Sequence, residues 1–85
     1  MDAYEIARRA SALPAKFADR VPLETLDGLR LMDEGGEYGE LTIELAATLG
    51  KIGAVVSPAE QQELRELLDA TGMPTESVDL IHVQR

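Results

Sequence analysis

Residues 33–51, DEGGEYGELTIELAATLGK, join a glycine-rich turn to an amphipathic helix and set the architecture of the chain. Apolar side chains recur here at the period of an α-helix, at Tyr38, Leu41, Leu45, Leu49 and Ile52. A stripe at this period predicts a helix from Glu37 to about Ile52 that packs against a core. Gly50 and Gly53 mark its exit, because glycine commonly ends a helix in a left-handed conformation.

The same stretch is strongly acidic. It holds five carboxylates and no basic residue before Lys51, the acids being Asp33, Glu34, Glu37, Glu40 and Glu44. Only Glu37 lies in the first turn of the predicted helix, where the helix dipole favours a negative charge by about 0.3–1 kcal/mol. Asp33 and Glu34 end the preceding helix, where the dipole disfavours them. Glu40 and Glu44 are like charges four residues apart, which repel each other. A basic partner explains this placement, and chance in an acidic chain is the competing explanation.

Two further helices flank the central one. Pro22 suits the first position of a helix, and Gly35 or Gly36 supplies its left-handed end. The residues expected on its buried side are Leu23, Leu26, Leu29 and either Leu31 or Met32. Gly28 weakens its middle unless another helix packs closely there. The segment Ser57-Pro58-Ala59-Glu60 is a capping box, and it begins a helix that buries Leu64, Leu67, Leu68 and Thr71 and ends at Gly72.

The two ends of the chain are expected to be helical as well. A first helix is predicted over Ala3–Leu13, with an apolar face of Tyr4, Ile6, Ala7, Ala10 and Leu13. Pro14 ends or kinks it, and Phe17 then folds back onto the core. Residues 74–85 favour a short helix capped by Thr75, although their β-branched residues also suit an extended segment. We therefore predict an all-α fold, a small four-helix bundle with a short C-terminal tail or helix, in one domain of residues 1–85.

Composition limits the classes of function. The net charge of −8 disfavours binding to nucleic acid and to anionic membranes. The chain has no cysteine, and no apolar run is long enough to cross a membrane. Arg8 and Arg9 are followed by no apolar run of the kind a secretory signal requires. We expect a cytoplasmic protein without nucleic-acid or membrane partners.

Catalysis and cofactor binding are not expected. The only imidazole is His82, and there is no cysteine nucleophile. Asp33–Glu44 has the length of an EF-hand loop, but Gly35 stands at ligand position 3 and Tyr38 at the position that requires glycine. Gly35 and Gly36 have no basic residue nearby to hold a phosphate, and no serine lies in the Asp-Ser-Leu motif of carrier proteins. We therefore predict no enzyme activity, no metal and no cofactor.

Three consecutive segments resemble the MafI-type family of small bacterial immunity proteins. They are VPLETLDGLRLMDEGGEYGEL (21–41), TIELAATLGKIG (42–53) and AVVSPAEQQELRELLDATGMP (54–74). The chain departs from the family pattern at Tyr38, where proline is common, and at Ala46, Ala47 and Gly50, where a cysteine and aromatic residues are common. The resemblance implies a cytoplasmic, non-enzymatic protein that binds and blocks a cognate polymorphic toxin, commonly a nuclease.

A nuclease site is basic because it holds phosphates, so an acidic helix face suits such a partner. The contact residues we predict are Asp33, Glu34, Glu37, Tyr38, Glu40 and Glu44, with Tyr38 as aromatic anchor and Glu37 in support. The alternative is an acidic helical adaptor or regulatory domain that binds another basic protein. A homodimer through an apolar stripe is compatible with the sequence, but nothing indicates one.

Overall fold

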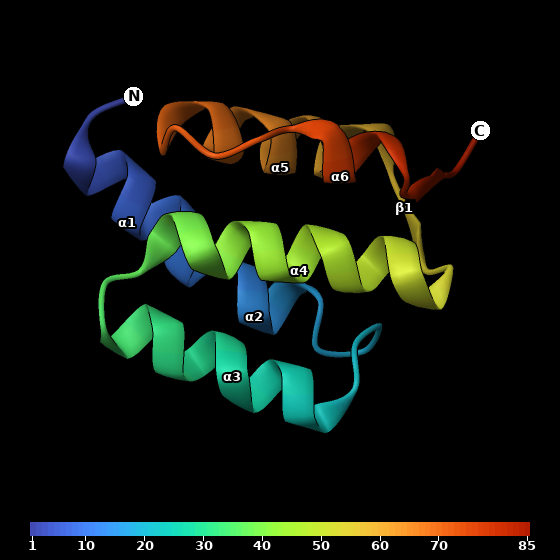
Figure 1. Cartoon of the computed structure of the whole chain (residues 1–85), viewed down its shortest axis with the longest axis horizontal. Coiled ribbons are helices and arrows are strands. Elements are labelled where there is room, and N and C mark those ends of the chain that lie inside the picture. Colours follow the sequence, from blue (N-terminus) through green and yellow to red (C-terminus); the bar gives the residue numbers. More distant parts are fainter.

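Helix α4 (Tyr38–Ile52) lies at the centre of a computed structural model that describes residues 1–85 (Figure 1). The remaining elements are α1 (Ala3–Ser11), α2 (Leu13–Lys16), α3 (Leu23–Glu34), β1 (Val55–Val56), α5 (Pro58–Ala70), α6 (Glu76–Asp79) and β2 (His82–Val83). Helices α1, α3, α5 and α6 all contact α4. The chain is therefore mostly helical, with one very small sheet, in agreement with the expected all-α class. The four-helix-bundle topology stays a prediction.

The apolar stripe of α4 forms the middle of the core. Leu41, Leu45 and Leu49 are fully buried in a single cluster of 13 residues that lie between Leu13 and Ile81. At the ends of the predicted stripe, Tyr38 is partly buried, but Ile52 is 47% exposed, so the prediction is wrong for Ile52. Both lie in terminal turns of the helix, where fewer neighbours cover them. Gly53 ends the helix in the left-handed conformation, with a φ of 71°, as predicted.

Helix α3 buries Leu26 and Leu29 against α4. Leu23, expected on the same side, is 69% exposed, so that prediction is wrong. It lies in the first turn, about 60° around the helix from Leu26 and on the side away from Leu29. Pro22 is the N-cap rather than the first helical residue, and Gly36 makes the left-handed turn with a φ of 70°.

The N-terminal helix is interrupted just before Pro14, as the proline led us to expect. Helix α1 ends at Ser11, and α2 follows with Pro14 in its first turn. Phe17 then returns to the core with 1% of its surface exposed, which confirms its predicted role. Tyr4 does not belong to the apolar face, because it lies about 120° around α1 from buried Ala10, and it is 78% exposed.

Helix α5 begins with the predicted capping box. The amide of Glu60 donates to Ser57 Oγ at 3.0 Å, and the amide of Ser57 donates to Glu60 Oε1 at 2.8 Å. Three leucines of this helix, Leu64, Leu67 and Leu68, are fully buried, and Gly72 follows its end with a φ of 71°.

The C-terminal tail contains both expected conformations in succession. Helix α6 is a single turn that buries Val78, and β2 then pairs in parallel with β1, with Val55 opposite His82 and Val56 opposite Val83. The sequence did not predict this pairing, because it joins residues far apart in the chain. None of the helices has both the length and the apolar character that crossing a membrane requires.

Candidate partner-binding surface

The six predicted contact residues lie around the junction of α3 and α4. Asp33 and Glu34 end α3, and Glu37 is the N-cap of α4. At 100° per residue, Glu37, Glu40 and Glu44 fall within about 60° of one another on α4. All three are exposed, as is Glu34. We call these carboxylates, together with Asp33, the acidic face.

No residue of the acidic face forms an ion pair. The basic side chains that do form ion pairs, Arg9, Lys16, Arg20 and Arg65, all bind acids elsewhere in the chain. The acidic face therefore has no ion-paired basic side chain, whereas six of the other eleven acids have one.

Two members of the acidic face have structural reasons that the sequence did not reveal. Ser11 Oγ donates a hydrogen bond to Asp33 Oδ1, which joins the end of α1 to the end of α3. Glu40 lies in the first turn of α4, where the helix dipole favours it. Each of these two residues therefore has a stabilising feature beside the unfavourable one expected from the sequence. Only Glu34 and Glu44 remain without a structural explanation.

Glu37 and Tyr38 are less free than a contact role suggests. A Cβ atom on Gly35 would lie 3.3 Å from Glu37 Oε2, so the Glu37 side chain folds over the glycine turn. Tyr38 is partly buried, and its carbonyl accepts a hydrogen bond from Thr42 Oγ1 at 2.8 Å. Tyr38 can present only part of its ring to a partner.

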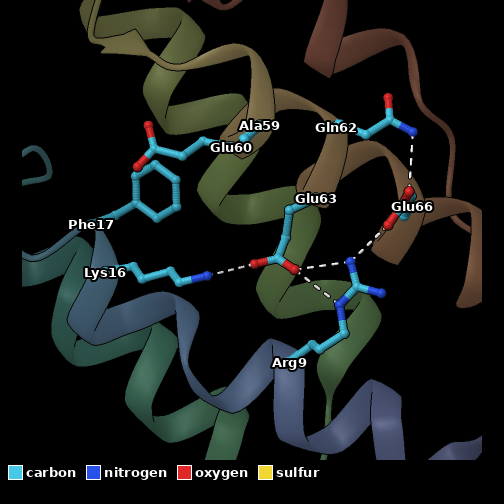
Figure 2. A pocket seen from close by; sticks show the side chains of 8 residues that line it. All are labelled: Arg9, Lys16, Phe17, Ala59, Glu60, Gln62, Glu63 and Glu66. Carbon is cyan, nitrogen blue, oxygen red and sulfur yellow. Dashed lines mark hydrogen bonds and ion pairs between the residues drawn. The ribbon is translucent and has the colours of Figure 1, made fainter.

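A separate group of charges joins α1 and α2 to α5 (Figure 2). Arg9 donates to Glu63 at 2.9 Å and to Glu66 at 2.7 Å, and Lys16 donates to Glu63 at 2.7 Å. These groups border a shallow hollow of about 350 Å³. The hydrogen bond from Arg9 lowers the pKa of Glu66. Burial alone would raise the pKa of Glu63, but Lys16 and Arg9 outweigh it and the pKa is lowered. Both carboxyls stay ionised near neutral pH, which suits a structural role rather than proton donation.

Arg20 forms a second link between distant segments. Its guanidinium binds Glu60 through two hydrogen bonds of 2.8 Å and lies 4.4 Å from the centre of the Phe17 ring. The same group donates to the carbonyls of Lys16 and Val55. Sequence analysis missed this link, whose only signal was opposite charge on segments forty residues apart.

A second hollow lies between α4 and α6 and was also not predicted. Its volume is about 430 Å³, and it is lined by Ala47, Gly50, Lys51, Ser77 and Leu80. The hollow forms only because the C-terminal tail packs against α4, and the local sequence of the tail does not predict where it packs.

The chain has no group of three or more histidine or acidic side chains placed to hold a metal ion. Residues 38–44, the second half of the EF-hand-length segment, are helical. Comparisons of the chain with protein-family models, with curated proteins and with solved structures find no match. The fold and surface define a small, mostly helical protein with an acidic face that forms no ion pair.

Proposed function

We propose that this protein is an immunity protein that binds and neutralises a cognate bacterial toxin domain through the acidic face. In this proposal it is a small four-helix bundle that acts in the cytoplasm without chemistry of its own. Its partner is a basic domain, and a nuclease is the kind of toxin that suits it best.

The separation of charges within the molecule carries the proposal. Arg9, Lys16, Arg20 and Arg65 pair with acids that hold helices together, and none pairs with the acidic face. Exposed Glu34 and Glu44 have no local structural role. Their like-charge neighbours, Asp33 and Glu40, add to a negative potential that favours a basic ligand.

The physics of association also favours this role. Complementary charge speeds the encounter of two proteins, with rate constants that reach about 10⁸–10⁹ M⁻¹s⁻¹ at low salt. A producing cell has to neutralise a toxin before the toxin acts, so fast association benefits such an inhibitor. A basic phosphate-binding site is the natural target for an acidic helix face.

Co-expression tests the proposal. The probe is the basic C-terminal domain of a large secreted protein encoded by the neighbouring reading frame. Cells that produce this domain should die without the present protein and survive with it. The two proteins should also co-elute in size-exclusion chromatography. Death in both cases, with no complex, would contradict the immunity function. If the neighbouring genes instead encode metabolic or regulatory proteins, the acidic adaptor becomes the better explanation.

A further inference from the structure

The hollow between α4 and α6, lined by Ala47, Gly50, Lys51, Ser77 and Leu80, is called the groove from here on. It lies on the same side of α4 as the acidic face. Ala47 and Lys51 follow Glu44 by three and seven residues. At 100° per residue these two positions fall within about 60° of Glu40 and Glu44. A partner bound along Glu40 and Glu44 therefore reaches the groove without crossing another element.

The groove is apolar and open. Leu80, which forms one wall, is 74% exposed, although burial of a leucine side chain stabilises a protein. Gly50 forms part of the floor, where a Cβ atom would lie 3.5 Å from Leu80 Cβ and from the Leu80 carbonyl oxygen. The absence of a side chain at Gly50 thus leaves room beside Leu80.

We propose that this groove receives an apolar side chain of the toxin. This inference rests on the proposed immunity function and specifies the partner further. The toxin surface must present an apolar side chain about 9–15 Å from its basic residues, which is the distance along α4 from Glu44 and Glu40 to Gly50. Lys51, which has no ion pair, stands at the rim of the groove and repels a basic residue there. The complex therefore has one orientation along α4.

Two substitutions in the 85-residue chain test the groove. Gly50→Ala adds a methyl group at ordinary contact distance and suits a helix better than glycine, so thermal stability should be unchanged or higher. Leu80→Ser removes an exposed apolar wall. Each should weaken binding to the neighbouring frame's toxin domain about tenfold or more. Gly28→Ala is the matched control, because this glycine lies in α3 with no neighbouring atom near its Cβ position, and it should leave the dissociation constant unchanged.

A second measurement needs no toxin. Titration of the isotope-labelled protein with N-acetyl-leucinamide should shift the amide resonances of Ala47, Gly50 and Leu80, and the Gly50→Ala variant should lose these shifts. If the probe shifts none of these resonances, the proposed site is wrong. If Gly50→Ala and Leu80→Ser leave toxin affinity unchanged while Glu40→Lys/Glu44→Lys weakens it, the groove is excluded and the immunity function stands. If the charge reversal also has no effect, the proposed acidic face is wrong as well.

Discussion

Asp33 and Glu34 are sequence neighbours with different surroundings. Asp33 is partly buried and accepts a hydrogen bond from Ser11, whereas Glu34 is exposed and has no partner. Sequence alone treats the two carboxylates as equivalent, because both end α3 against the helix dipole. A distant contact separates them into one structural residue and one that is free for a partner.

This difference predicts different costs of mutation. Asp33→Ala should lower the free energy of unfolding by about 0.5–1.5 kcal/mol, because it removes the hydrogen bond from Ser11 that joins α1 to α3. Glu34→Ala should change stability by no more than about 0.5 kcal/mol, as expected for an exposed side chain. Urea denaturation of both variants measures the difference. Equal effects on stability would show that the Ser11 contact contributes nothing.

The positions of the main helices can be predicted from local sequence signals. The period of leucines predicts α4, the capping box predicts the start of α5, and Gly36 and Gly53 end helices in the expected conformation. Two features of the fold could not be predicted from such local signals. The pairing of β1 with β2 depends on residues about 27 positions apart, and the exposure of Leu23 depends on how α3 rotates against α4. Four of the six contact residues are exposed as expected, but the reasons for Asp33 and Glu40 required the fold.

Gly28 interrupts α3 without a packing reason. A Cβ atom at this position has no neighbour within 4 Å, so no helix packs closely there. Gly28→Ala should therefore raise the free energy of unfolding by about 0.5–1 kcal/mol, because alanine loses less backbone entropy in a helix. Gly53→Ala is the contrasting variant and should destabilise the protein, since Gly53 has a φ of 71°. Chemical denaturation compares them, and a destabilised Gly28→Ala protein would contradict the prediction.

The Arg20–Glu60 pair makes the start of α5 sensitive to acid. Two hydrogen bonds from Arg20 lower the pKa of Glu60 from its usual 4.5 to about 2. A carboxyl with a lowered folded-state pKa stabilises the protein above its usual pKa, and this contribution is lost as the pH falls from 4.5 towards 2. Glu60→Gln keeps a capping side chain but removes the charge.

At neutral pH, Glu60→Gln should therefore be less stable than the unmodified protein by about 1–3 kcal/mol, a range that allows for solvent screening of the partly exposed pair. The difference should shrink steadily as the pH is lowered towards 2. Urea denaturation across this pH range measures it for both proteins. A difference that is independent of pH would show that the charge of Glu60 does not stabilise the fold.

At the scale of the whole molecule, six of the 16 acids form ion pairs and five make up the acidic face. Acids on α5 bind the basic side chains of the N-terminal segment and hold the helices together. The acidic face has no such partner, and an apolar groove extends from it along α4. A surface that combines unpaired charge with an open apolar site is typical of a binding protein, where charge guides association and a few buried contacts supply affinity.

Charge reversal on the acidic face tests this account in one comparison. The measurement is the dissociation constant for the neighbouring frame's toxin domain, by isothermal titration calorimetry. Glu40→Lys/Glu44→Lys should weaken binding at least about a hundredfold and remain folded, because both side chains are exposed. The control Glu24→Lys/Asp27→Lys makes the same change in net charge at exposed side chains of α3 that form no ion pair, and it should alter the affinity by no more than about threefold. Equal affinities for the two double variants would contradict the acidic face as the binding surface.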